Sequence, residues 1–332
     1  MKAVCLTADN TVRVEDVPMP SKAEAGHVIV KMIACGINLG DSAFIGGLFP
    51  VGTIPVSQYD ICGVSGVGVI EQVGSGLPKE YVGRNVTIYR SLKFSDSLVG
   101  TWCEKAHVAR QHFVILPNDV DPVDYSASLV NVITPYAFLK QIIEEGHKGI
   151  ITTAGSSATG LAMLGICAAY DFPLISIVRS EKAKDELQLS GAKNVLAQTD
   201  PDFKRQLAEL SQGMNATGVF DGVGASLVND ILEVLPRRTT VYSYGYLGGV
   251  TPFTIPPGLM MRKGLTIKSF GNFTSKTVQD TRLLDEALTE IGRIIRSPRF
   301  RTKPGRKFSF EEAGDALQYV SSNGGKAVLY PV

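Results

Sequence analysis

Thr153-Ala154-Gly155-Ser156-Ser157-Ala158-Thr159-Gly160 is the stretch of sequence that decides the fold. It joins an apolar run at 149–153 to an apolar helical segment at 161–170. At such a junction the backbone can bend against a pyrophosphate that lies at the N-terminus of the helix. Small side chains allow a close approach, and Ser156, Ser157 and Thr159 add hydroxyl donors. The stretch therefore predicts a nucleotide-phosphate turn. A strict G-x-G-x-x-G is absent, so an ordinary tight strand-to-helix turn remains the alternative.

The segments that follow this turn alternate between short apolar strands and longer helices. Strands are expected at 149–153, 174–178, 194–196, 218–221 and 240–244, and helices at 161–170 and 181–190. Alternation of this kind is typical of a parallel, doubly wound sheet, the Rossmann type. The rhythm begins near Asp124, so the dinucleotide-binding domain is expected at 123–271.

The first 120 residues have a different character. Short β-branched runs, such as 28–33 and 67–70, are separated by glycines and prolines, which predicts a mainly β domain able to close into a barrel. Near the end of the chain we expect helices at 281–297 and 310–321 and a strand at 326–330. Ser309 and Glu312 have the spacing of a capping box for the second helix. The fold class is α/β, with a Rossmann domain and a barrel-like β domain.

Composition excludes several functions. The chain has 332 residues, enough for two domains, and a formal net charge of +1, which gives no support for nucleic-acid or membrane partners. Its start lacks the apolar stretch of a secretory leader. Five dispersed cysteines without a Cys-x-x-Cys pair suit reduced thiols. A cytoplasmic location is expected.

The end of the second expected strand bears on the choice of cofactor. Val178 is followed by Arg179 and Ser180, with Lys182 close behind. An acidic residue here would bind the ribose 2′-hydroxyl of NAD, whereas a guanidinium suits the 2′-phosphate of NADP. NADPH is therefore the expected cofactor. A solvated basic helix start is the alternative reading of the same residues.

Six segments, in order along the chain, resemble the medium-chain dehydrogenase/reductase superfamily, most closely its zinc-free quinone oxidoreductases and trans-2-enoyl thioester reductase-like members. Any one match is weak, but six in order over most of the chain make a strong case. The matching segments are Cys35–Asp41, Gly63–Gly74, Val82–Val86, Gly100–Glu104, Asn131–Tyr136 and Ala154–Leu161.

The resemblance implies a GroES-like catalytic domain at 1–122 plus 272–332, split around the Rossmann domain. It also implies a homodimer, commonly through edge strands of the nucleotide domain. Asn131 would line the nicotinamide pocket and Thr134 would contact the carboxamide. Lys326 matches a family lysine near the phosphate end of the cofactor. Further cofactor contacts are implied for a group of residues that, like Lys326, also fit structural turns or core aromatics: Asp221, Tyr244, Gly245 and Phe270.

Departures from the family pattern concern zinc. Zinc-dependent members have a cysteine where this chain has Asn38, and Gly-His-Glu where it has Gly63-Val64-Ser65. A catalytic zinc needs about three protein ligands and an open position, so no metal is expected. The four histidines do not group with cysteines in the sequence, and each reads as an ordinary surface or core residue: His27, His107, His112 and His147.

Three residues are candidates for the catalytic centre. Asn38 carries an amide suited to orient the nicotinamide or a substrate carbonyl, and its alternative role is that of a turn residue. Asp41 suits a catalytic role or a cap on the helix that follows it. Phe49 stands where enoyl reductases often have a tyrosine; without a hydroxyl it can only contact substrate.

These observations predict hydride transfer from NADPH to a small electrophile, either an activated C=C bond of an enone or enoyl thioester, or a quinone. Without a Lewis acid, hydrogen-bond donors would stabilise the developing enolate. One alternative is a metal-free alcohol or aldehyde reductase. Another is a non-catalytic NADPH-binding protein that senses redox state or binds RNA; the missing tyrosine motivates it, and the near-neutral charge argues against RNA.

Overall fold

The computed structural model describes residues 1–46, 58–90, 100–319 and 325–331. The chain forms two compact units, one made of residues 1–133 and 278–332 and the other of residues 134–277. The first boundary falls inside the helix α2 (Ser128–Glu144), whose apolar residues are mostly buried. The boundaries expected from the sequence, 122/123 and 271/272, lie earlier along the chain.

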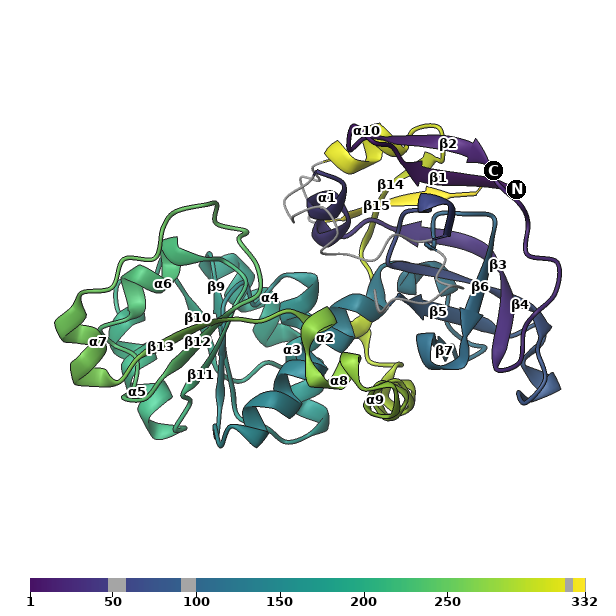
Figure 1. Cartoon of the computed structure of the whole chain (residues 1–332). Coiled ribbons are helices and arrows are strands. Elements are labelled where there is room, and N and C mark those ends of the chain that lie inside the picture. Colours follow the sequence, from purple (N-terminus) through teal and green to yellow (C-terminus); the bar gives the residue numbers. More distant parts are fainter. Residues whose placement is uncertain (47–57, 91–99, 320–324, 332) are drawn as a thin grey trace. The chain divides into compact units, whose positions relative to one another are not determined.

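Unit 2, residues 134–277, is built on a six-stranded parallel sheet (Figure 1). Its strands follow the spatial order 3-2-1-4-5-6 when numbered along the unit, which is the order of a Rossmann fold. The expected doubly wound sheet is therefore confirmed. The strands are β8 (Ile150–Thr152), β9 (Leu174–Val178), β10 (Val195–Ala197), β11 (Gly218–Asp221), β12 (Thr240–Ser243) and β13 (Thr266–Ser269).

Helices connect these strands and lie on both sides of the sheet (Figure 1). The core packs branched strand residues such as Ile151, Ile175 and Val219 against apolar helix residues such as Leu207 and Ile231. Burial on both faces explains why these strands read as unbroken apolar runs. The helices are α3 (Ala158–Ala169), α4 (Glu181–Leu189), α5 (Phe203–Gly213), α6 (Ala225–Ile231) and α7 (Pro257–Lys263).

Unit 1 is mainly β, as expected. Its long strand β3 pairs with β4 on one edge; on the other it pairs first with β6 and then with β15. The end of the chain thus completes the domain that the start begins (Figure 1). The strands are β1 (Lys2–Leu6), β2 (Val12–Asp16), β3 (His27–Gly36), β4 (Ser65–Val73), β5 (Asn85–Tyr89), β6 (Lys105–Ala109), β7 (Phe113–Ile115), β14 (Pro304–Ser309) and β15 (Lys326–Tyr330).

The helices of unit 1 are short, apart from α9 (Thr281–Ile294), which Asp280 caps through its side chain. The helix expected at 310–321 is observed as α10 (Ala313–Gln318). Glu312 accepts from the backbone N–H of Ser309 at 2.8 Å, which is one half of the expected capping box, but the Ser309 hydroxyl also donates to Glu312 instead of capping the helix. Turns closed by Glu312 N to Ser309 O and by Ala313 N to Phe310 O precede the helix, which begins at Ala313. The remaining helices are α1 (Leu39–Ile45) and, at the boundary between the units, α8 (Lys276–Gln279). Within the described residues, none of the helices is both long and apolar enough to cross a membrane.

Candidate functional site

The turn between β8 and α3 has the backbone of a phosphate site. Ala154 adopts a left-handed conformation, with φ 51°, and Ser157 caps α3 by accepting a hydrogen bond from Gly160 N at 3.1 Å. Backbone N–H groups in the first turn of an α-helix such as α3 have no intrahelical acceptor. Together with the helix dipole they favour an anion at this end of α3.

Two glycines make this turn possible. A Cβ on Gly160 would lie 2.4 Å from the carbonyl oxygen of Ala154, so only glycine allows the helix to start against the turn. Gly155 packs on the end of β9, where its N–H donates to Ile177 O at 2.9 Å. The side chain of Ser156 is exposed. The turn is therefore fixed in shape and open to solvent at the Ser156 hydroxyl, which suits a pyrophosphate site.

The basic residues after β9 differ in whether they form ion pairs. Lys184 pairs with Glu181 at 3.2 Å and with Asp200 at 3.8 Å. Arg179 and Lys182 are exposed and form no ion pair within the described part of the chain. The hydroxyl oxygen of Ser180 accepts from Ala183 N at 3.3 Å and caps α4, which leaves its proton available. Arg179 thus offers an unengaged guanidinium one residue beyond β9.

Asp221 serves the turn after β11. Its carboxylate accepts from the Thr153 hydroxyl at 2.7 Å and from the N–H groups of Val223 and Gly224 at 3.1 Å. Burial raises its pKa, and these donors oppose the rise. The Thr153 hydroxyl in turn accepts from Gly222 N. The structure thus gives Asp221 the turn-forming role that the sequence left as an alternative to the cofactor contact.

The other residues of unit 2 that were expected to contact the cofactor lie in different surroundings. Phe270 is buried and packs edge-on against Phe138 and Phe220, so it belongs to the core. The Tyr244 ring stacks on Phe220, with centroids 3.9 Å apart. Thr134 Oγ1 accepts a 2.6 Å hydrogen bond from Asn272, a partner that the sequence did not suggest.

Gly245 lies at the carboxyl end of β12, where a Cβ would come 3.0 Å from the carbonyl oxygen of Gly222. The turns after β11 and β12 therefore approach each other closely at this edge of the sheet. Ligands of open parallel sheets bind at the carboxyl ends of the strands, at the point where the strand order reverses. In unit 2 that point lies between β8 and β11.

Unit 1 contains a polar cluster, here called the Asn38 cluster, of the buried residues Asn38 and Asp41 and the half-buried residues Asn131 and Lys326. Asn38 Oδ1 accepts hydrogen bonds from Lys326 Nζ at 2.6 Å and from Asn131 Nδ2 at 2.8 Å. Lys326 was expected near the cofactor phosphates, and the structure places it against Asn38. Asn131 Nδ2 also donates to Ala127 O, and this second hydrogen bond fixes the orientation of the Asn131 amide.

The orientation of the Asn38 amide follows from chemistry. An ammonium group only donates, so the oxygen of Asn38 must face Lys326 and the nitrogen must face away. That nitrogen, Nδ2, is buried and has no hydrogen-bond partner among the described residues. A buried amide donor left unpaired costs about 1–3 kcal/mol. The protein therefore holds one oriented N–H donor ready for an acceptor.

Asp41 and Lys326 place opposite charges beside this amide. Asp41 lies in the first turn of α1, accepting from Asn38 N at 2.8 Å and Val64 N at 3.2 Å, so its expected capping role is present. Burial raises the pKa of Asp41 to about 6, opposed by these N–H donors and the charge of Lys326. Burial lowers the pKa of Lys326 to about 8, opposed by the charge of Asp41.

One residue beside the cluster was not expected, and one expected site residue is not described. Arg90, which the sequence did not suggest, is buried after β5, and its charge acts on Asp41; burial lowers its pKa to about 10. An arginine at the end of an apolar strand, Val86–Tyr89, was the available signal. Phe49, the expected substrate contact, lies outside the described residues.

The cluster does not suit a zinc ion. It offers one carboxylate, Asp41, and places the cations Lys326 and Arg90 beside it. Asn38 and Val64 have no thiolate or imidazole to give, and zinc sites use thiolate, imidazole and carboxylate ligands.

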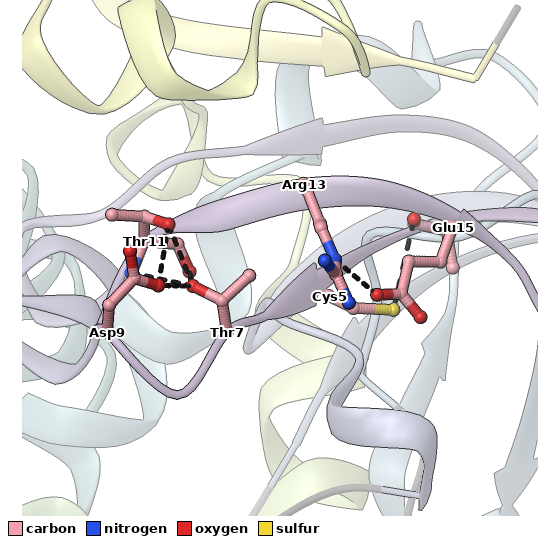
Figure 2. Close-up of polar contacts among 7 residues, drawn as sticks. Cys5, Thr7, Asp9, Thr11, Arg13 and Glu15 are labelled. Atoms are coloured by element: carbon pink, nitrogen blue, oxygen red, sulfur yellow. Dashed lines mark hydrogen bonds and ion pairs between the residues drawn. The ribbon is translucent and has the colours of Figure 1, made fainter.

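A second polar region lies on the β1–β2 hairpin, where an open hollow of about 640 Å³ is found. Thr11 donates to Thr7 and Asp9, and Arg13 pairs with Glu15 (Figure 2). Thr7, Asp9 and Thr11 bond to one another and close the hairpin turn.

Two family descriptions match the chain. One, "Alcohol dehydrogenase GroES-like domain", matches residues 24–118, and the other, "Zinc-binding dehydrogenase", matches residues 158–287. Each description matches only one part of the chain. Distant relatives that are oxidoreductases match nearly the whole of it. The chain belongs to the medium-chain dehydrogenase/reductase superfamily. Within it, the chain falls in the quinone oxidoreductase and enoyl thioester reductase branch.

The relatives include both kinds of enzyme. A quinone oxidoreductase of Pseudomonas aeruginosa is 25% identical over 94% of this chain and 93% of its own length. A mitochondrial enoyl-[acyl-carrier-protein] reductase of Dictyostelium discoideum is 24% identical over 96% of this chain and 90% of its own. The structure of Escherichia coli quinone oxidoreductase complexed with NADPH has a TM-score of 0.72 at 21% identity, covering 99% of both chains, and shares the fold.

Proposed function

We propose that this medium-chain reductase transfers hydride from NADPH, without zinc, to the conjugated C=C bond of an enone or enoyl thioester, or to a quinone. The observation that carries the proposal is the unpaired Asn38 Nδ2, buried and oriented by Lys326 and Asn131. A preorganised donor of this kind stabilises negative charge that develops on an oxygen. Conjugate reduction of a carbonyl compound and reduction of a quinone both develop such charge.

Each unit has its own part in this proposal. In unit 2, the turn 154–160 holds the pyrophosphate and Arg179 the 2′-phosphate, and the bound nucleotide supplies the hydride. In unit 1, Asn38 is the catalytic residue, donating through Nδ2 to the substrate oxygen. Lys326 and Asn131 are positioning residues that hold the amide. The positive charge of Lys326 also polarises the amide and strengthens its N–H as a donor.

A substrate panel tests the reaction class. Purified protein is mixed with NADPH and, separately, with enones, enoyl thioesters, quinones and simple aldehydes, and products are identified. We expect turnover of at least one conjugated or quinone class, with saturated carbonyl compounds or quinols as products. Turnover of aldehydes alone would favour the metal-free carbonyl reductase. Tight NADPH binding with no turnover across the panel would favour a non-catalytic binding protein.

We further propose that the chain forms a homodimer through unit 2. Strand β13 ends the sheet, and the stretch 246–261 exposes several large apolar side chains, including Leu247, Val250 and Met261. A sheet edge with such neighbours is suited to pairing with a second copy. Light scattering should give twice the chain mass. Leu247→Glu should give the monomer mass, and a monomeric wild type would refute the dimer.

A further inference from the structure

Positive charge is concentrated in one segment of unit 1, residues 293–307, here called the basic segment. It contains seven of the 33 lysines and arginines of the chain and no aspartate or glutamate, so the other 317 residues have a formal net charge of −6. We propose that the basic segment binds the phosphate groups on the pantetheine arm of a thioester substrate. This rests on the proposed function, because it names the substrate class that the Asn38 site reduces. The basic residues are Arg293, Arg296, Arg299, Arg301, Lys303, Arg306 and Lys307.

Ion pairs engage only some of these side chains. Three of the arginines pair with carboxylates, at distances of 2.5 to 3.7 Å. Arg293 and Lys307 are exposed and form no ion pair within the described part of the chain. The ammonium of Lys307 lies 5.2 Å from the centre of the Tyr330 ring. A cation–π contact of this kind holds the ammonium in place without neutralising its charge.

The middle of the basic segment packs directly against the residues that carry the Asn38 cluster. Lys326 N donates to Lys303 O at 2.9 Å, while the ammonium of Lys326 holds Asn38 Oδ1. The hydroxyl oxygen of Thr302 accepts from Ala127 N at 2.9 Å, four residues before Asn131 on the chain. A substrate held at the Asn38 amide therefore has the basic segment beside it.

The length and chemistry of the segment suit a phosphorylated arm. Strand β14 advances about 3.3 Å per residue, so Lys307 lies roughly 13 Å beyond Lys303. An extended pantetheine arm separates a thioester from its first phosphate by a similar length. Ammonium and guanidinium groups are the usual side-chain ligands of phosphate. A simple enone or a quinone carries no anionic group for these side chains to bind.

Other polyanions suit the segment less well. Phe300, its one aromatic residue, is buried, so residues 293–307 offer no exposed ring on which a nucleic-acid base could stack. The same residues include no exposed large apolar side chain that could enter a lipid surface. A small phosphorylated substrate needs neither feature, and the nearby Asn38 amide supplies a place for its reacting end.

Matched thioesters test the proposal at saturating NADPH. The full chain is given crotonyl-CoA and crotonyl-N-acetylcysteamine, which has the same acyl group and no phosphate. The ratio of the two kcat/KM values should be about tenfold or more in favour of CoA. Added NaCl should lower this ratio, because salt screens the attraction between exposed charges.

Crotonyl-phosphopantetheine, with a single phosphate, separates two sources of the same chemistry. A kcat/KM near that of crotonyl-CoA would assign the segment to the phosphate that CoA shares with carrier-bound thioesters. A kcat/KM near that of the neutral thioester would assign it to the phosphates of CoA that lie farther along the arm.

Substitutions locate the site. Lys303→Gln combined with Lys307→Gln should lower the CoA preference about tenfold, because two charge-assisted contacts are lost. Lys79→Gln, an exposed lysine of unit 1 outside the segment, is the matched control and should keep the preference. Equal kcat/KM for the CoA and N-acetylcysteamine thioesters in the wild type would overturn the site.

Calorimetry with free CoA, again at saturating NADPH, separates the site from the reaction. If the double variant weakens CoA binding and no thioester is reduced, the phosphate site stands and the proposed function fails. Equal CoA binding by the wild type and the double variant would overturn the site. Binding of single-stranded RNA or phosphatidylserine vesicles that the double variant loses, without CoA binding, would overturn it in favour of a macromolecular anion.

Discussion

The phosphate turn of unit 2 and the Asn38 cluster of unit 1 are built in opposite ways. The turn is one contiguous segment, 153–160, whose shape follows from its own glycines and its helix cap. The cluster joins residues from separate segments, and 288 positions separate Asn38 from Lys326. A site formed by one contiguous segment can therefore be predicted from the sequence of that segment. A polar cluster formed by distant segments depends on which strands pair. Variants of the two regions should fail differently: turn variants in cofactor binding, cluster variants in turnover.

The largest effect is expected in the cluster. Asn38→Ala removes the oriented donor and should lower kcat about 10²- to 10³-fold, as the loss of one oxyanion donor does. Because the phosphate turn is untouched, the Kd of NADPH should stay the same. Steady-state kinetics and cofactor titration measure the two quantities, with the exposed Asn118→Ala as a control. An equal loss of cofactor binding would show that Asn38 is structural.

The next effect concerns cofactor choice. Arg179→Ala removes an unengaged guanidinium and should weaken NADPH about 10- to 150-fold, the range of a charge-assisted hydrogen bond of about 1.5–3 kcal/mol. NADH binding should change little, because NADH has no 2′-phosphate. Lys184→Ala, whose charge is already paired, is the matched control. If NADPH and NADH weaken together, the role of Arg179 is structural.

A methyl group in the phosphate turn should cost stability. Gly160→Ala forces a Cβ against Ala154 O, where 2.4 Å is available, and should lower the free energy of unfolding by about 1–3 kcal/mol. Gly213→Ala is the control, because a Cβ there meets nothing within 4 Å. Denaturant unfolding with and without NADPH measures both. Equal stabilities of the two variants would show that the turn is not tightly packed.

The smallest effect is a pH dependence of turnover. Activity needs the Asp41 carboxylate and the Lys326 ammonium, so the rate should fall as pH drops below about 6, where Asp41 binds a proton, and as it rises above about 8, where Lys326 loses one. On each side of the optimum the turnover rate should change by about tenfold per pH unit. Because Asp41 and Lys326 interact, the two apparent pKa values describe the pair and not either residue alone. Lys326→Gln should remove the alkaline limb and Lys326→Arg should restore activity at pH 9. A wild-type profile that is flat from pH 5 to 9 would refute the pair.

Much of unit 2 could be predicted, because each strand and helix leaves a local pattern. Strands β9 and β11 begin and end where the sequence indicated, at 174–178 and 218–221. The role of Asp221 was not predictable, since a strand-end carboxylate can bind a ribose or close a turn with equal ease. The hydrogen bond that the Thr153 hydroxyl donates to Asp221 is visible only in the structure.

Less of unit 1 could be predicted. Asn38 and Asp41 were identified as candidates, but Lys326 was assigned to the phosphate end, because nothing in its own segment reveals that β15 pairs with β3 beside Asn38. Arg90 was missed although its place after the apolar strand Val86–Tyr89 was a local signal, because its partner Asp41 lies in a distant segment.

The central claim is that hydride reaches a conjugated carbon without zinc. The direct test follows deuterium from C4-deuterated NADPH into an α,β-unsaturated ketone, using protein that has been dialysed against a chelator. We expect deuterium on the β-carbon of the saturated product, at the same rate as with untreated protein. Deuterium on the carbonyl carbon, or a rate lost on chelation and restored by zinc, would contradict it.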